Sequence, residues 1–322
     1  MLPFEQVKSM ESQVRRIIAL GDLVWDVLVK PDTVLLPGGD TTGRVLLAPG
    51  GSAANVAAWV ARAGSPAGFV GSIGADTFGE LIVEDLQREG VELSISRTPL
   101  HDTGVILVLI DLQGQRSMVT NQGADFHLLP EDLPEETLRT CAHLHIAAWS
   151  LFTDPPRAAA LRAAQIARAA GATVSLDPAS YQMISEMGNL AFAQITVGLP
   201  VDMLFPNRDE GRVLTGEQEP RAIAAALRER YPGTIVVLKL DRDGCFVMAD
   251  QHAQHYPTPD GPVVDATGAG DAFDAAFTAS YMRDHDLGRA AQFANRIGAW
   301  VVARYGARPA VDDELRAILK QS

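Results

Sequence analysis

Cysteine, lysine and long apolar runs are scarce in this chain of 322 residues. Cys141 and Cys245, its two cysteines, lie far apart and outside any CxxC spacing. Neither a disulfide framework nor a cysteine zinc site is therefore indicated, and we expect a reducing, cytoplasmic location. No apolar run reaches the roughly 18 residues of a membrane helix. The segment from Met1 to Arg16 also lacks the apolar core of a signal peptide, so no membrane partner is expected.

The charge balance argues against a second class of partner. Aspartates and glutamates number 40 against 27 lysines and arginines, which leaves a formal net charge of −13. Nucleic acids need a positive field on the protein that binds them, so we expect no nucleic-acid partner. The hydrophobic fraction of 47% is sufficient for a large buried core.

Short aliphatic segments alternate with alanine-rich amphipathic segments over most of the chain. The former are typical of buried parallel strands and the latter of helices that cover them. The expected strands are 17–20, 68–71, 144–147, 173–176, 203–205 and 234–238. The expected helices are 53–63, 78–89, 156–170, 207–215 and 221–230. This alternation predicts an α/β fold with a doubly wound sheet.

Two segments interrupt the alternation. Residues 27–47 contain the turn Pro37-Gly38-Gly39-Asp40, and in residues 104–120 Gly114 separates two extended runs. Both are typical of antiparallel hairpins inserted between α/β units. We infer a small β-sheet lid over one edge of a large domain, 17–322, which follows an N-terminal extension, 1–16.

A glycine turn, Gly268-Ala269-Gly270, precedes a predicted helix and follows the extended Val263-Val264. Small residues let backbone N–H groups converge, and the helix start adds partial positive charge, so this turn can hold a transferring phosphoryl group. Asp271, in the first helical turn, can accept the proton of an attacking hydroxyl. An ordinary turn in which Asp271 only complements the helix dipole explains the same residues. The polar side chains of Asp265 and Thr267 favour the anion site, because ligands bind where strands feed helices.

The common nucleotide motifs are missing from the sequence. Gly268-x-Gly270 is followed by Phe273 where a dinucleotide fingerprint needs Gly or Ala, and no GxxxxGK[ST] occurs. None of the four lysines stands in a glycine loop. A Walker-type NTPase and a protein kinase are therefore excluded.

A second glycine pair, Gly50-Gly51, joins the first hairpin to an alanine-rich helix. Paired glycines let a polyol approach the backbone closely, and Asn55 offers a donor and an acceptor to vicinal hydroxyls. Upstream, Asp26 stands where the first insertion departs, and its carboxylate can accept two hydroxyl hydrogen bonds. The structural alternatives are a Gly-Gly turn with Ser52 as the helix N-cap and a solvated Asp26 at a strand end.

Together these motifs resemble the ribokinase family of carbohydrate kinases, also called the PfkB family. The family's N-terminal signature is similar to 50–57 followed by 71–79, its C-terminal signature to 265–273, and its N-x-x-E motif to 207–210. The resemblance covers about 17 to 312. It implies a Rossmann-like three-layer αβα ribokinase fold whose β-sheet lid closes on the sugar and often forms a homodimer contact. It also implies ATP-dependent phosphorylation of a hydroxymethyl group.

The resemblance assigns catalytic and sugar-binding groups. Asp271 would be the general base. The anion hole would be formed by Gly268, Ala269 and Gly270. The sugar would contact Asp26, Gly50, Gly51 and Asn55. Such a set suffices in principle, because phosphoryl transfer relies on positioning and electrostatic stabilisation.

The resemblance further implies ATP, Mg²⁺ and, in many members, K⁺. Asn207 and Glu210 would organise Mg²⁺ and its waters. The ATP site would draw on Asn207, Lys239, Asp241, Gly244, Gly268, Gly270 and Asn295. The K⁺ site would draw on Asp265, Thr267 and Gly306. Ala310 stands where ribokinases usually carry a serine ligand, so potassium activation is left open.

The acceptor is less closely defined than the reaction. The lysine-poor substrate side favours a neutral sugar or a sugar acid, and ribose, fructose and 2-keto-3-deoxygluconate are the candidates. An adenosine-like nucleoside is the alternative acceptor. A catalytically silent ligand-binding protein that retains the fold is a third hypothesis.

Overall fold

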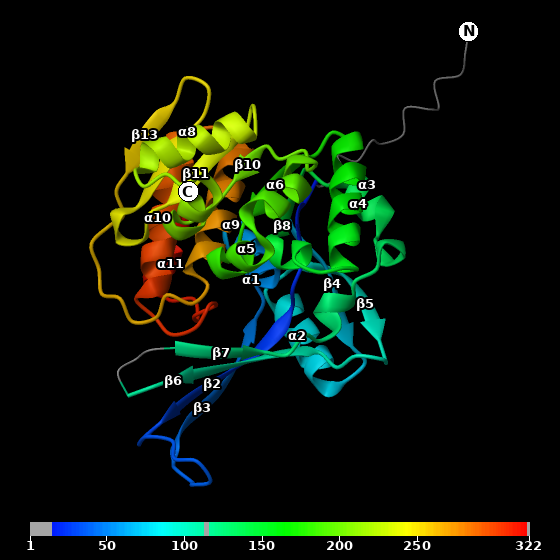
Figure 1. The fold of residues 1–322 in the computed structure, drawn as a ribbon, viewed down its shortest axis with the longest axis vertical. Helices are drawn as coiled ribbons and strands as arrows, with labels where there is room; N and C mark the ends of the chain where they lie inside the picture. Colours follow the sequence, from blue (N-terminus) through cyan, green and yellow to red (C-terminus); the bar gives the residue numbers. More distant parts are fainter. Residues whose placement is uncertain (1–14, 113–115, 321–322) are drawn as a thin grey trace.

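A large mixed sheet forms the centre of the computed structural model, which describes residues 15–112 and 116–320 (Figure 1). Its strands are β1 (Ile17–Leu20), β4 (Ala67–Gly74), β5 (Glu92–Thr98), β8 (His143–Ala147), β9 (Thr173–Asp177), β10 (Met203–Leu204), β11 (Ile235–Lys239), β12 (Cys245–Met248) and β13 (Ala253–Tyr256). They are ordered β13-β12-β11-β10-β9-β8-β1-β4-β5. The strands from β11 to β5 run parallel, and β12 and β13 extend the sheet antiparallel.

Helices cover both faces of this sheet. One face packs against α1 (Ser52–Arg62), α2 (Thr77–Arg88), α9 (Ala269–Asp284), α10 (Leu287–Val302) and α11 (Asp313–Leu319). The other packs against α3 (Glu135–Thr140), α4 (Pro156–Ala169), α5 (Tyr181–Met187), α6 (Asn189–Val197), α7 (Arg208–Thr215) and α8 (Pro220–Arg230). Side chains alternate between these two cores along the strands, as Ile17 and Ile18 do in β1. The three-layer αβα prediction is confirmed.

A separate small sheet projects from the main body (Figure 1). It consists of β2 (Val24–Pro31), β3 (Gly43–Gly50), β6 (Gly104–Ile110) and β7 (Arg116–Thr120), in the order β3-β2-β6-β7. The pairs β2/β3 and β6/β7 are antiparallel, and a parallel pairing of β2 with β6 joins them. The lid sheet expected from the sequence is thus present, although Gly114 lies outside the described residues.

The predicted strands and helices agree with the observed ones to within three residues at each end. The extended segment predicted at Val263-Val264 is wrong, because these residues belong to no strand. After β13 the chain crosses the end of the sheet irregularly, and Val264 N donates to Val302 O at 2.7 Å. The division into an extension and a domain at residue 17 stays a prediction, since residues 1–14 lie outside the described part. Among the described helices, none has the length and apolar character needed to cross a membrane.

Candidate active site

The polar side chains predicted to act together lie at the carboxyl edge of the main sheet. From β1, the chain order proceeds through β4 and β5 in one direction and through β8 to β13 in the other, so β1/β8 is the topological switch point. Ligands of doubly wound sheets bind at such points, outside the carboxyl ends of the strands. Asp22 follows β1, Asp177 ends β9 and Lys239 ends β11. The lid departs from the same edge, because β2 begins at Val24.

The glycine turn at the start of α9 has the geometry of an anion site. Gly268 is the N-cap residue and has a φ of 70°, in the left-handed region. A Cβ at this position would overlap Ala307, so only glycine fits. The N–H groups of the first turn, which begins at Ala269, and the helix dipole can bind an anion.

Asp265 fastens this turn to the C-terminal segment. Its Oδ1 accepts hydrogen bonds from Thr267 N at 2.9 Å and from Thr267 Oγ1 at 2.7 Å. Its Oδ2 accepts one from Gly306 N at 2.9 Å. The three residues predicted to bind K⁺ are therefore brought together around one carboxylate.

Asp271 lies in the first turn of α9 and is buried. Asn55 Nδ2, which is 216 positions away in the sequence, donates to Asp271 Oδ2 at 2.8 Å. Burial raises the pKa of Asp271 to about 7, the carboxylates of Asp177 and Asp22 add to the effect, and the Asn55 hydrogen bond opposes it. A carboxyl group with a pKa near neutrality is well matched to general base catalysis. Asn55 Oδ1 is buried without a hydrogen-bond partner in the described part of the chain, so it can accept a hydroxyl.

Asp22, which sequence reasoning did not select, holds the start of α1. Its carboxylate accepts hydrogen bonds from Ser52 N at 2.8 Å and Ala53 N at 3.1 Å. Ser52 is therefore not the helix cap. The N-cap residue is Gly51, with a φ of 94°, and a Cβ there would lie 2.5 Å from Asp22 O. The glycine allows the backbone to approach closely, and the helix start then directs Asn55 towards Asp271.

Asp26 is not a solvated residue at a strand end. Its carboxylate lies across Gly50, where a Cβ would be 2.5 Å from Asp26 Oδ2. Burial and the nearby Asp22 raise the pKa of Asp26 to about 6. A partly desolvated carboxyl group of this kind can bind hydroxyl groups.

Lys239 lies beneath the anion turn. Its Nζ donates to Asp274 Oδ2 at 3.0 Å and to Asp177 Oδ2 at 3.3 Å. A Cβ at Gly270 would lie 3.5 Å from the same Nζ. Burial opposes the charge of Lys239, but the two aspartates outweigh it and raise the pKa. The positive charge thus lies beside the start of α9, and sequence reasoning missed its partners Asp177 and Asp274.

Asn207 and Glu210 bind each other at the start of α7. Asn207 N and Nδ2 each donate to Glu210 at 2.8 Å, and Glu210 N donates to Asn207 Oδ1 at 2.9 Å. Burial and the charge of Asp177 raise the pKa of Glu210 to about 8. The described residues contain no cluster of three His, Cys, Asp or Glu suited to a metal. The pair fits Mg²⁺ through water, since this ion keeps several waters and takes substrate phosphates.

Two of the predicted nucleotide residues fix the loop after β13. Asn295 is buried and its Nδ2 donates to Tyr256 O at 2.9 Å and to Pro257 O at 3.3 Å. Gly244 has a φ of 89°, and a Cβ there would overlap Tyr256 O. Asp241 is exposed at the start of the preceding 3-10 turn. These residues lie at the edge of the sheet beside β12 and β13. They lie apart from the residues predicted to contact the sugar.

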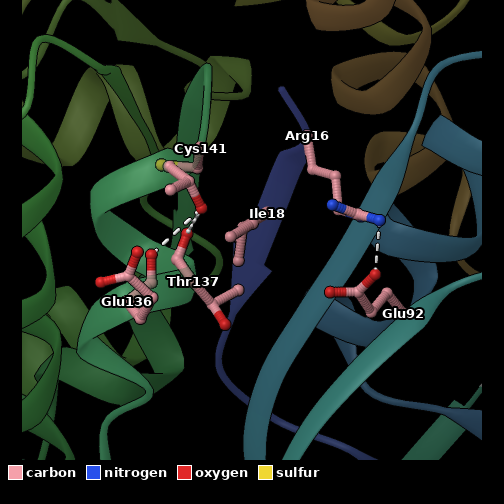
Figure 2. Close-up of a pocket in the computed structure, with 7 residues that line it drawn as sticks. Arg16, Ile18, Glu92, Glu136, Thr137 and Cys141 are labelled. Carbon is pink, nitrogen blue, oxygen red and sulfur yellow. Dashed lines mark hydrogen bonds and ion pairs between the residues drawn. The ribbon is translucent and has the colours of Figure 1, made fainter. Parts of the chain in front are cut away.

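A cavity of about 100 Å³ lies at the opposite edge of the main sheet (Figure 2). Arg16 and Glu92 line it, and they pair at 2.5 Å across the amino ends of β1 and β5. Cys141, which precedes β8, closes the other side. Arg16 and Glu92 neutralise each other and the cavity lies away from the carboxyl edge, so it is not the candidate active site.

Comparison with known proteins gives a consistent result. The profile of the pfkB family carbohydrate kinases matches residues 15–314. An ATP-dependent ribose-1-phosphate kinase from Halopiger xanaduensis is 33% identical over 309 residues, which cover 95% of this chain and 98% of the relative. A fructokinase from Escherichia coli is 30% identical over 306 residues, covering 92% and 96%.

Solved structures agree in fold. A putative ribokinase II from E. coli in complex with ATP and Mg²⁺ superposes with a TM-score of 0.82 at 26% identity, covering 96% of this chain and all of that one. Arabidopsis thaliana ribokinase complexed with ribose and ATP gives 0.80 at 25% identity, covering 95% and 99%. With these similarities the ribokinase fold is confirmed. The chain belongs to the PfkB family of carbohydrate kinases.

Proposed function

We propose that this kinase transfers the γ-phosphoryl group of ATP to a hydroxymethyl group of a small sugar, of the size of ribose, fructose or 2-keto-3-deoxygluconate. Asp271 acts as the general base. The observation that carries the proposal is the buried Asp271 carboxyl group, hydrogen-bonded to Asn55 at 2.8 Å and one turn from the Gly268 anion site.

The reaction follows from this arrangement. The acceptor hydroxyl donates its proton to Asp271 while its oxygen attacks the γ-phosphorus of ATP, and the bond from that phosphorus to the bridging oxygen of ADP breaks. The first-turn N–H groups of α9 and the Lys239 ammonium stabilise the negative charge of the transferring group. Asn207 and Glu210 would hold the waters of Mg²⁺, which when bound offsets phosphate charge.

The carboxyl groups around the acceptor favour a neutral sugar. Asp22 acts electrostatically on both Asp26 and Asp271, which disfavours an acceptor that carries its own negative charge. Ribose and fructose are therefore favoured over 2-keto-3-deoxygluconate, whose carboxylate is ionised at neutral pH. The E. coli relative named fructokinase is consistent with a neutral acceptor.

A phosphorylated pentose is the second candidate, because the Halopiger relative is named a ribose-1-phosphate kinase. It would need a cation near the acceptor. The side chain of Arg308 is 2% exposed, its charge reaches Asp26, and its Nε and Nη2 have no hydrogen-bond partner in the described residues. Its Nη1, however, already donates to Asp85 at 2.8 Å.

A panel of acceptors separates these candidates. ADP release from Mg-ATP is measured with ribose, fructose, 2-keto-3-deoxygluconate, ribose 1-phosphate and adenosine, and each product is identified by mass spectrometry. A neutral sugar should give the highest kcat/KM. A preference for ribose 1-phosphate that is lost in Arg308→Gln would support the second candidate, and a preference for adenosine would make the chain a nucleoside kinase.

Potassium dependence is a separate part of the proposal. The turn around Asp265, Thr267 and Gly306 carries oxygen atoms of the kind that alkali cations bind. Replacing NaCl by KCl at equal ionic strength should raise kcat. Equal rates in the two salts would rule the activation out.

We further propose that the protein forms a homodimer through its lid sheet and that it is located in the cytoplasm. Val45 on β3 and Val119 on β7 are 65% and 66% exposed, and apolar side chains gathered on a sheet face are typical of an interface. Val119→Glu should shift the mass measured by light scattering from dimer to monomer. A wild-type monomer would refute the assembly, and cell fractionation tests the location.

A further inference from the structure

Three lid strands place two glycines in one row. Val24 on β2 pairs with Gly50 on β3 and with Gly104 on β6. Residues directly opposite each other on neighbouring strands present their side chains to the same face. The row therefore has one apolar side chain in the middle and no side chain at either end.

A carboxyl group covers each end of this row. Asp26 lies over Gly50, as described above. Asp125, in the 3-10 turn from Ala124 to His127, lies over Gly104, where a Cβ would overlap Asp125 Oδ1. Two strand spacings, roughly 10 Å, separate the two glycines. A monosaccharide fits between groups at this distance and can be bound from both sides.

Asp125 has the properties of a ligand-binding group rather than a structural one. The residue is 7% exposed, and its Oδ1 is buried without a hydrogen-bond partner in the residues that the structure describes. Buried polar atoms are nearly always hydrogen-bonded, because an unsatisfied one is costly. Burial and the charge of Asp22 raise the pKa of Asp125 to about 8. Asp22 has the same effect on Asp26 and Asp271, so the charge of Asp22 reaches all three carboxyl groups.

We propose that Asp125 is a second acceptor-binding carboxyl group, which hydrogen-bonds a sugar hydroxyl from the side opposite Asp26. Together the two groups select polyhydroxylated acceptors, because each can hydrogen-bond a sugar hydroxyl. The inference rests on the proposed function to the extent that the acceptor is a sugar. It adds a specificity residue that the family signatures in this sequence do not include.

The test uses Asp125→Ala and the near-isosteric Asp125→Asn, with Asp132→Ala as the matched control, since Asp132 is an exposed carboxylate on the neighbouring turn. D-Fructose and D-ribose are the probes. Their KM values are measured beside the KM for ATP, and their Kd values are measured by calorimetry, which needs no turnover. Asp125→Ala should raise the sugar KM and Kd about tenfold or more, with much smaller changes in kcat and in the KM for ATP. Asp132→Ala should resemble the wild type.

The other possible results separate a binding role of Asp125 from a structural one. Asp125→Asn should retain part of the affinity, because the amide still accepts a hydrogen bond. Folded Asp125 variants with unchanged sugar affinity would overturn the inference, as would a wild type that binds neither sugar. Losses of sugar and ATP affinity together with a lower Tm would show a structural role instead. Sugar binding that depends on Asp125 without ADP release would contradict the proposed function but not the role of Asp125.

Discussion

Replacing Lys239 by Met would leave two carboxyl groups buried without their cation. Asp177 and Asp274 are 7% and 0% exposed at the side chain, and Lys239 itself is 13% exposed. Removing one partner of a buried ion pair costs about 3–5 kcal/mol, which corresponds to a fall in Tm of roughly 5–15 °C. Lys30→Met makes the same change of charge on an exposed lid position and should cost less than about 0.5 kcal/mol.

The pH should change the stability difference between wild type and Lys239→Met in one direction. Because the pKa of Lys239 is raised, its stabilisation is present below the unfolded value and is lost only as the pH rises through the higher folded value. The pKa of Asp177 is lowered by Lys239 against the opposing effect of burial, so its stabilisation is lost as the pH falls through the folded value. In Lys239→Met the buried aspartates take up protons as the pH falls, so the stability gap to wild type should be smaller at pH 5 than at pH 8.

Urea denaturation at pH 5, 7 and 8 measures this gap, with Lys239→Arg as a variant that keeps the charge. A gap below about 1 kcal/mol at pH 8, or one of equal size at all three pH values, would refute the buried-charge account of this cluster. Intermediate stability of the arginine variant would be consistent with it.

Three further predictions concern the site. The kcat/KM should fall as the pH drops through about 7, because the Asp271 pKa of about 7 sets the fraction of active base; a flat profile between pH 6 and 8 would contradict this. Gly268→Ala should lower the free energy of unfolding by about 1–3 kcal/mol more than Gly64→Ala does in urea denaturation. Both positions have positive φ, but only Gly268 lacks space for a Cβ. Equal losses in the two variants would contradict the steric argument. Without ligands, the stability of Asp125→Asn relative to wild type should rise between pH 5 and pH 8. The raised pKa of Asp125 makes the folded wild type hold a proton that the unfolded chain releases, so the wild type loses stability over this range. Thermal melts at the two pH values would show no such rise if Asp125 were solvated.

Local sequence patterns predicted most of the fold and the two glycine turns of the site. The alternating aliphatic and alanine-rich segments gave strands such as β1 and helices such as α1 nearly to the residue. Gly268 and Gly51 were recognisable because turns with positive φ depend on glycine. The family resemblance selected both Asn55 and Asp271, but only the structure shows the hydrogen bond between them across 216 positions.

The rest of the site depends on tertiary contacts that leave no local signal. Asp22, Asp125 and Asp274 are single aspartates outside the glycine motifs. Only the packed structure shows that Asp125 and Asp274 are buried and that Asp22 binds the start of α1. The position of Asp22 directly after the strand β1 was the one available sign. Lys239 was assigned to the nucleotide pocket as a whole, and its pairing with Asp177 and Asp274 could not be inferred from spacing.

The central claim is that Asp271 is the base of an acceptor-dependent phosphoryl transfer. The most direct test is the initial rate of ADP release from Mg-ATP with the best neutral sugar, for wild type and Asp271→Asn, with sugar and ATP binding measured by calorimetry on both proteins. The account predicts that binding survives while turnover falls by about 10²–10⁴-fold, the usual contribution of a general base. An Asp271→Asn variant that turns over at close to the wild-type rate would contradict it.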